Sequence, residues 1–207
     1  STLLASSAAS DVYKRQYISS VNTDNYMGAL QATSLLIRDK CDILIHINVN
    51  VNKSIPAYDR IRAFQATCEE YHVPYDIDLS VEGDSYHKIL DVIREIFNKI
   101  ESKYPNQKKG IFLANDTYAN MFLNLIFQKY GTFPSTYEIV GFDNSPIASE
   151  AILPITTIGQ QINVIAKTAM DLLIQQMENQ KKRVPKPLGK PIHKQITPIL
   201  IRRNTTE

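Results

Sequence analysis

Two short stretches of the chain end in side chains that can bind a small polar molecule. Residues 139–144 form an apolar run typical of a β-strand, with the carboxylate of Asp143 near its end. Residues 154–160 read as a short strand that ends in the amide of Gln160 and leads into a helical pattern. Because open α/β sheets bind small ligands beside the ends of their strands, these two groups predict a ligand-binding site. They indicate a sensor and not a catalyst.

Arg60 and Asn115 extend the predicted site. Arg60 lies near the start of a helix that follows a strand. A guanidinium there can make two parallel hydrogen bonds to hydroxyl groups or to a carboxylate. Asn115 precedes another predicted helix and offers both a donor and an acceptor. Carboxylate and amide groups outnumber basic groups among these candidates, which favours a neutral polyol over a charged ligand.

Each of these side chains also has a purely structural role open to it. Arg60 could form a salt bridge with Asp59 or with a later acid, and Asn115 could cap the helix that it precedes. Asp143 could bond the local turn, and Gln160 could point into solvent. The sequence alone leaves both readings open for each residue.

Composition excludes several classes of function. The 207 residues carry a net charge of only +2, which gives no electrostatic reason for nucleic-acid binding. No apolar run approaches the roughly 18 residues that span a membrane. No nucleophile elbow, Gly-rich phosphate loop or metal-ligand spacing of histidines is present, so we expect no enzyme, no cofactor and no metal. Cys41 and Cys68 lie in apolar patterns and are predicted to be buried thiols of a reducing compartment.

From residue 17 onward, strand and helix patterns alternate. Strands are predicted over residues 41–47, 75–81, 110–114 and 137–142, and a terminal strand over 196–201. Amphipathic helices lie between them, with Pro56 in the first turn of one and Asp116 as the N-cap of another. Helical connections of this length imply a parallel sheet with helices on both faces, an α/β fold. A Lys/Pro-rich linker is predicted over residues 181–194.

Residues 1–16 differ from the rest of the chain. They are rich in Ser and Ala and have no sustained period, basic start or long apolar core. We expect residues 1–16 to be a non-native or disordered leader, and the native protein to begin upstream.

Six motifs in sequence order carry a family resemblance. Residues 60–64 read Arg-Ile-Arg-Ala-Phe, with Ala63 where an Arg-x-x-Gly-Phe pattern has glycine, and residues 113–116 read Leu-Ala-Asn-Asp. The others lie at residues 21–29, 139–144, 154–160 and 198–205. Together they resemble the effector-binding domain of the lactose-repressor/galactose-repressor family of bacterial transcriptional regulators.

The resemblance implies a periplasmic-binding-protein-like type I fold of two α/β lobes, with an effector in the cleft between them. Residues 22–155 and 195–205 would form a nearly complete second lobe. Residues 156–180 would form a crossing strand and a helix of the first lobe, most of which is missing. We therefore expect the helix at residues 162–177 to expose an apolar stripe.

The resemblance also implies a function. The chain would sense a small molecule, most simply a mono- or disaccharide, for a cytoplasmic, homodimeric repressor. Operator DNA would bind through an N-terminal helix-turn-helix outside this chain, and effector would shift operator affinity by favouring one lobe angle. Ser85 occupies a position where the family often has an aromatic residue that stacks on the ligand. A purine or a phosphorylated sugar is an alternative effector, which Arg60 could bind. A periplasmic sugar-binding receptor of a transport or chemotaxis system is the alternative.

Overall fold

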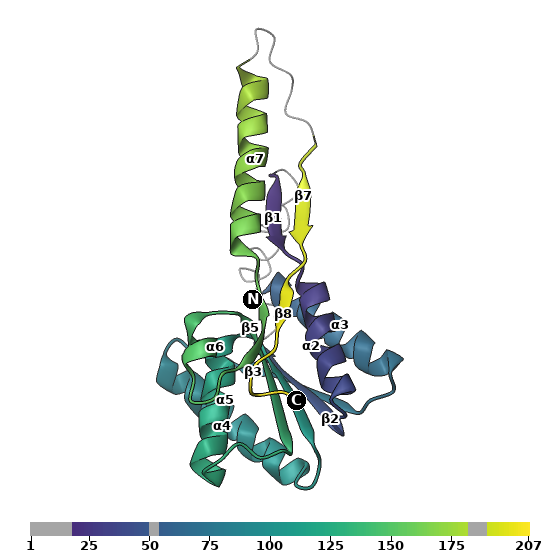
Figure 1. The fold of residues 1–207 in the computed structure, drawn as a ribbon, viewed down its shortest axis with the longest axis vertical. Helices are drawn as coiled ribbons and strands as arrows, with labels where there is room; N and C mark the ends of the chain where they lie inside the picture. Colours follow the sequence, from purple (N-terminus) through teal and green to yellow (C-terminus); the bar gives the residue numbers. More distant parts are fainter. Residues whose placement is uncertain (1–17, 50–53, 182–189) are drawn as a thin grey trace, which may run out of the picture. The chain divides into compact units, whose positions relative to one another are not determined.

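A computed structural model describes residues 18–49, 54–181 and 190–207 (Figure 1). The predicted leader and most of the predicted Lys/Pro-rich linker lie outside the described residues. The chain divides into two compact units, which are described separately. The larger comprises Asn25–Gln160 and Pro198–Glu207, and the smaller comprises Ser1–Asp24 and Gln161–Thr197.

The larger unit is built on a six-stranded sheet with the strand order β3-β2-β4-β5-β6-β8. Neighbouring strands from β3 to β6 are parallel, and β8 pairs antiparallel with β6. The strands are β2 (Ile43–Val49), β3 (Tyr75–Val81), β4 (Lys109–Leu113), β5 (Tyr137–Asp143), β6 (Thr156–Gly159) and β8 (Ile199–Ile201). The predicted α/β class is confirmed.

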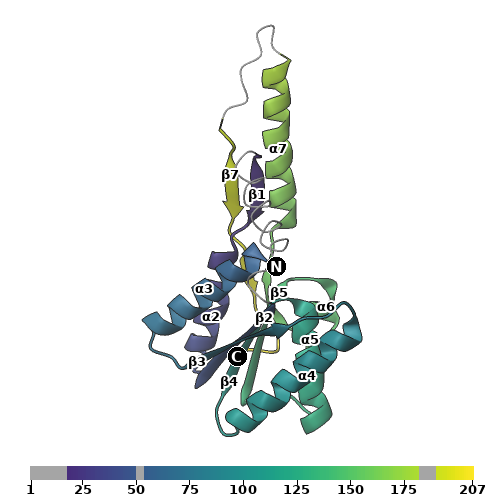
Figure 2. The ribbon, with the colours of Figure 1, turned by 180° about the vertical axis from the view of Figure 1, so that it is seen from behind.

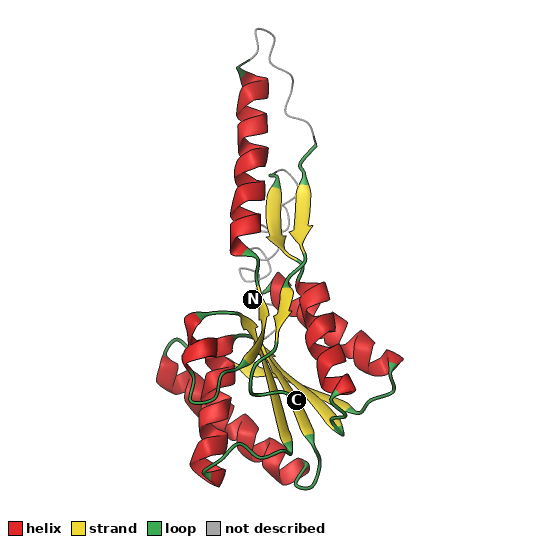
Figure 3. Cartoon of the chain, in the orientation of Figure 1, coloured by secondary structure: helices red, strands yellow, loops and turns green. Residues whose placement is uncertain are grey.

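Helices cover both faces of this sheet, as the two opposite ribbon views and the secondary-structure view show (Figures 1, 2 and 3). One face carries α2 (Asn25–Arg38) and α3 (Ile55–Glu70). The other carries α4 (Tyr86–Lys103), α5 (Asp116–Tyr130) and the short α6 (Pro146–Glu150). A parallel sheet with helices on both faces buries its strands on both sides, which explains why the strands read as apolar runs.

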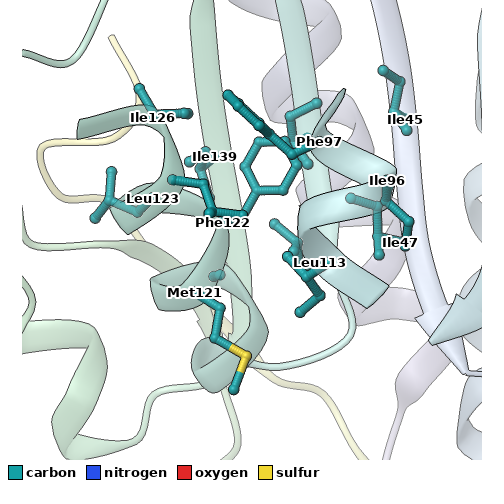
Figure 4. Packing of buried hydrophobic residues seen from close by; sticks show 14 of the residues in the cluster. Ile45, Ile47, Ile96, Phe97, Leu113, Met121, Phe122, Leu123, Ile126 and Ile139 are labelled. Atoms are coloured by element: carbon teal, nitrogen blue, oxygen red, sulfur yellow. The ribbon is translucent and has the colours of Figure 1, made fainter. Parts of the chain in front are cut away.

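Alternate residues of the central strands point to opposite faces of the sheet and belong to two separate apolar cores. Ile45 and Ile47 point into the core under α4 and α5, whereas Leu44 points into the core under α2 and α3. Figure 4 shows the first core, where Phe97 and Phe122 meet edge to face with ring centroids 5.4 Å apart. Each buried side chain of this size stabilises the fold by about 1.5–3 kcal/mol. The larger unit therefore has a core of its own.

Local sequence signals account for the helix ends. Ser54 caps α3, with Pro56 in the first turn as predicted. Gly131 ends α5 in the left-handed conformation with φ of 71°. The prediction of Asp116 as the N-cap of α5 is wrong, since Asn115 caps this helix and accepts a hydrogen bond from Tyr118 N at 2.9 Å. Asp116 is instead drawn inward by partners distant in sequence.

A charged cluster lies at the amino edge of the sheet, where β4 and β5 begin, and its centre at Glu101 and Lys109 is buried. Glu101, on α4, accepts hydrogen bonds from Lys129, Tyr130 and Tyr137. Lys109, the first residue of β4, is 2% exposed, and its Nζ lies 4.0 Å from Glu101 Oε1. Although burial opposes ionisation of Glu101, these hydrogen bonds hold its pKa below its usual value. The cluster ties both strands to α4 and α5.

The smaller unit contains a two-stranded parallel sheet and one helix. Its elements are β1 (Ser20–Thr23), β7 (His193–Ile196) and α7 (Ile162–Gln180). The apolar stripe predicted on this helix is confirmed, because Ile162, Leu173 and Met177 are each at least half exposed. Within the described residues, no helix combines the length and apolarity that crossing a membrane requires.

Two predicted boundaries differ from the structure. The strand predicted over residues 196–201 is broken, because β7 pairs with β1 whereas β8 pairs with β6. The strand at residues 156–159 was expected to belong with the helix that follows it. It lies instead between β5 and β8 in the larger sheet, so that the larger unit comprises 25–160 and 198–207 and not 22–155 and 195–205.

The predicted burial of both cysteines is confirmed. Cys41 and Cys68 are free thiols that are 6% and 0% exposed. Burial raises the pKa of each thiol to about 12, so both stay protonated near neutral pH.

Candidate functional site

The parallel strands of the larger unit bring four of the five predicted site residues to one edge of the sheet. Arg60 reaches this edge from α3, and Asn115 follows β4. Asp143 is the last residue of β5, and Gln160 follows β6. All four side chains belong to residues that are partly exposed. This edge, at the carboxyl ends of β2, β4, β5 and β6, is called the carboxyl edge below.

Arg60 is held in place on three sides. Its Nε donates to Asn25 Oδ1 at 2.9 Å, and its Nη1 donates to the backbone oxygen of Ala114. The guanidinium carbon lies 3.5 Å from the centroid of the Phe142 ring. The salt bridge to Asp59 that the sequence left open does not form. The arginine is therefore fixed in orientation before any ligand arrives.

Arg60 keeps part of its bonding capacity. A guanidinium has five N–H donors, and only those at Nε and Nη1 meet acceptors in the described part of the chain. Burial lowers the pKa of this side chain to about 10, an effect that the charge of Asp143 opposes. Arg60 remains a cation near neutral pH, with donors at Nη2 for a further acceptor.

Asp143 and Gln160 form a preset pair. Gln160 Nε2 donates to Asp143 Oδ1 at 2.6 Å, which leaves Asp143 Oδ2 as an acceptor. The backbone here is strained, with φ of 102° at Asp143 and 53° at Asn144. Residues other than glycine seldom adopt such angles, and strain of this kind is concentrated at functional sites. The turn-capping role open to Asp143 is not what the structure shows.

Asp116 supports this turn from below. Its Oδ2 accepts hydrogen bonds from Ser145 N at 2.7 Å and Ser145 Oγ at 3.1 Å, and its Oδ1 accepts one from Thr157 Oγ1 at 2.6 Å. Asp116 is 1% exposed, and burial raises its pKa. A Cβ on Gly141 would lie 2.3 Å from Asp116 Oδ1, so glycine is required for this approach. The strained segment is thus fastened to both α5 and β6.

Asn115 and Ser85 both cap helices. Asn115 caps α5, which is the structural role left open for it, and its amide nitrogen stays available as a donor. Ser85 caps α4, accepts weakly from Lys88 N at 3.5 Å and is exposed. It follows β3, the outermost strand of the sheet, whereas the other four residues follow or face its central strands.

A buried polar pair on β2 lies below the carboxyl edge. His46 is 0% exposed, and its Nδ1 lies 2.9 Å from the backbone oxygen of Phe112. Its Nε2 lies 2.9 Å from Asn48 Nδ2, which donates, so that Nδ1 carries the proton. Burial lowers the pKa of His46 to about 3. The imidazole of His46 is a neutral, buried element of β2.

The arrangement suits the binding of a polar ligand. It offers fixed donors on Arg60, an acceptor on Asp143 and an amide on Gln160, which match a ligand rich in hydroxyl groups. No group of three His, Cys, Asp or Glu side chains in the described ranges is arranged to hold a metal ion.

The sequence reasoning missed the residues that position Arg60. Asn25 was not among the predicted site residues, and Phe142 was predicted only as part of a strand. The position of Phe142 directly before Asp143 was a usable signal, because a strand that ends at the site carries both residues there. Asn25 had no such signal, since its contact with Arg60 joins helices that are far apart in sequence.

Comparison with known proteins gives consistent matches. A family model described as periplasmic binding protein-like domain matches residues 36–206. The ribose operon repressor of Halalkalibacterium halodurans is 27% identical over 197 residues, which cover 95% of this chain and 55% of that protein. The sucrose operon repressor of Streptococcus mutans is 28% identical over 161 residues, which cover 77% of this chain and 47% of that protein.

A solved structure agrees with these matches. It is a periplasmic binding protein/LacI transcriptional regulator from Alkaliphilus metalliredigens complexed with D-xylulofuranose. The two proteins are 25% identical with a TM-score of 0.72, and the match covers 93% of this chain and 67% of that one. The chain spans about half the length of the curated repressors that it matches.

Proposed function

This chain belongs to the periplasmic binding protein-like domain family and resembles its lactose-repressor/galactose-repressor members, and we propose that it is the sugar-sensing part of a bacterial transcriptional repressor. The observation that carries the proposal is the preset polar group at the carboxyl edge. Arg60, Asp143 and Gln160 are oriented by protein contacts, and within the described part of the chain Arg60 Nη2 and Asp143 Oδ2 remain open to a ligand.

The effector is a neutral mono- or disaccharide. Adjacent hydroxyl groups on a sugar can donate to Asp143 Oδ2 and accept from Arg60 Nη2, while Asn115 and Gln160 add amide contacts. The charges of Arg60 and Asp143 offset one another, so that a neutral ligand leaves no charge uncompensated. Ser85 is the most peripheral of the proposed contacts. The names of the relatives, which are repressors of ribose and sucrose operons, support a sugar.

The remaining parts of the proposal concern the whole regulator. Operator DNA binds through an N-terminal helix-turn-helix outside this chain, and the regulator acts in the cytoplasm as a homodimer. The chain has no catalytic role of its own. Effector changes operator affinity by favouring one of two conformations, and a 100-fold difference in effector affinity between them is worth about 2.7 kcal/mol of coupling. The repressor names of the relatives favour this reading over a periplasmic receptor.

A titration followed by nuclear magnetic resonance tests the proposal. The 15N-labelled chain is titrated with neutral monosaccharides and disaccharides, and then with their phosphorylated forms. We expect saturable shifts of the Asp143, Asn144 and Gln160 amides with at least one neutral sugar, and none in Asp143→Ala. Absence of shifts with every sugar, or equal shifts in the variant, would contradict the site.

A further inference from the structure

The segment that follows β8 is anchored to two strands of the larger sheet. Thr205 is buried, and its Oγ1 donates to the backbone oxygen of Ile139 at 2.8 Å and accepts from Thr156 N at 2.9 Å. Arg203 N donates to Thr156 Oγ1 at 2.8 Å. Because β5 contains Ile139 and β6 begins at Thr156, these bonds fix the backbone from which the Arg203 side chain extends.

The guanidinium of Arg203 bridges both ends of one loop. Its Nη1 donates to the backbone oxygen of Ile155 at 2.8 Å, and its Nη2 donates to Asn144 Oδ1 at 2.6 Å. Asn144 directly follows β5, Ile155 directly precedes β6, and the loop between them carries α6. Both acceptors are neutral oxygen atoms, so the planar fork of donors joins them by its geometry and not by charge pairing.

The strained residues Asp143 and Asn144 are thereby held from several sides. Strain of this kind persists only where the surrounding structure fixes it. Gln160 bonds the side chain of Asp143, and Asp116 bonds the residue that follows Asn144. Arg203 adds a bond to the side chain of Asn144 itself. Each of these three bonds comes from a different segment of the larger unit.

We propose that Arg203 is a positioning residue of the sugar site, which holds Asn144 and thereby keeps the Asp143 carboxylate in the conformation that binds. The inference rests on the proposed function, in which Asp143 accepts from the sugar. The backbone nitrogen of Asn144 has a long bond of 3.4 Å to Thr157 Oγ1, which holds the turn less firmly. Without the bond from Arg203, the turn relaxes toward unstrained backbone angles and the carboxylate changes direction.

Relaxation of the turn lowers the sugar affinity because fewer molecules are competent to bind. The apparent dissociation constant rises by the inverse of the fraction that stays in the binding conformation. Release of one strained residue favours the relaxed backbone by about tenfold. Arg203→Gln, which keeps a polar side chain but lacks the fork, should therefore weaken sugar binding by about tenfold.

Nuclear magnetic resonance of the sugar-free chain tests the positioning directly. In Arg203→Gln we expect changes in the 13Cα resonance of Asp143 and in the side-chain amide resonance of Gln160, which donates to Asp143. Arg202→Gln is the matched control, because this neighbouring side chain is 43% exposed and points to Asp39, and it should leave both resonances in place. Unchanged resonances in Arg203→Gln would overturn the proposal, whether or not the chain binds sugar.

Calorimetric titration with D-ribose and with sucrose measures the consequence for binding. Wild type and Arg202→Gln should bind one of these sugars equally well, and Arg203→Gln about tenfold more weakly. Wild-type affinity in Arg203→Gln would also overturn the proposal. Absence of binding by the wild type would count against the proposed function alone, and the resonances of the sugar-free chain would then decide the role of Arg203.

Asn144→Gly is a second variant, which decides the question if Arg203→Gln does not fold. Glycine adopts the positive φ of this position without penalty and removes the acceptor of the bond from Arg203. The side-chain amide resonance of Gln160, far from both substitutions in the sequence, should change as expected for Arg203→Gln. An unchanged Gln160 resonance in Asn144→Gly would refute positioning through Asn144.

Discussion

Polar side chains gather at both edges of the larger sheet, but they are used in different ways. At the amino edge, Glu101 and Lys109 are enclosed among tyrosines and lie on regular helix and strand backbone. At the carboxyl edge, Arg60 and Asp143 are partly exposed, and the backbone at Asp143 has φ of 102°. A dense cluster of charges is therefore no sign of a binding site by itself. Free bonding capacity and strained backbone distinguish the carboxyl edge.

The side chains at the two edges are held in fixed positions for different purposes. Glu101, Lys109 and Tyr137 of the amino-edge cluster contact one another and join helices to strands, so their loss should act on stability. The carboxyl-edge groups are oriented by Asn25, Phe142 and Asp116 but keep unused donors and acceptors. Their loss should act on ligand affinity. Mutations at the two edges can test this division.

The largest effect is expected for Glu101→Ala at the amino edge. Removing one partner of a buried ion pair leaves Lys109 uncompensated and costs about 3–5 kcal/mol of unfolding free energy. Urea unfolding measures this change. The matched control is Asp91→Ala, which breaks the exposed pair with Arg94 and should cost at most about 1 kcal/mol. Similar losses in both variants would show that the cluster is not buried as described.

Asp143→Ala at the carboxyl edge should act on binding. Losing hydrogen bonds to a charged acceptor weakens sugar affinity by about 1.5–3 kcal/mol, or roughly 10- to 100-fold. Calorimetric titration of the full-length regulator measures the affinity, and operator binding without effector should be unchanged. Normal induction in this variant would remove Asp143 from the site.

Backbone strain can be isolated by comparing glycine with alanine at position 143. Both variants lack the carboxylate, but only alanine is penalised at positive φ, so Asp143→Gly should be more stable by about 1–2 kcal/mol. At the regular strand position 138 the order should reverse, with Glu138→Gly less stable than Glu138→Ala by about 0.5–1 kcal/mol. Thermal melts of the four variants measure both differences. The same order at both positions would contradict the strain assigned to the carboxyl edge.

His46, on β2 below the carboxyl edge, gives a prediction about pH. Its folded pKa of about 3 lies below the usual 6.5, so only the unfolded chain takes up a proton between these values. Stability from this group is lost as the pH falls below 6.5, by up to about 1.4 kcal/mol per pH unit. Urea unfolding of His46→Gln should lack this part of the slope, whereas the exposed His87→Gln should retain it. Equal slopes in the two variants would show that His46 takes up its proton in the folded chain.

The sequence predicted what depends on local patterns. The bounds of β3, the start of β5 and Pro56 in the first turn of α3 follow from apolar runs and backbone preferences. The ends of strands placed Asp143 and Gln160 at one edge, because parallel strands share an edge. The resemblance to a known family added the connection to sugars.

The sequence did not predict what depends on contacts between distant segments. Residues 196–201 read as one strand, but β7 ends at Ile196 and pairs with β1, whereas β8 pairs with β6 in a different sheet. Asn115 and Asp116 are equally good caps by type, and only the distant Ser145 and Thr157 decide which one turns inward.

The most direct test of the division between the edges is a thermal melt of the full-length regulator with and without a neutral sugar, in wild type, Asp143→Asn and Glu101→Gln. We predict that Asp143→Asn melts near the wild-type temperature but loses the rise in Tm caused by the sugar. Glu101→Gln should melt at a lower temperature and keep that rise. A sugar-dependent rise that survives in Asp143→Asn, or disappears in Glu101→Gln, would contradict the account.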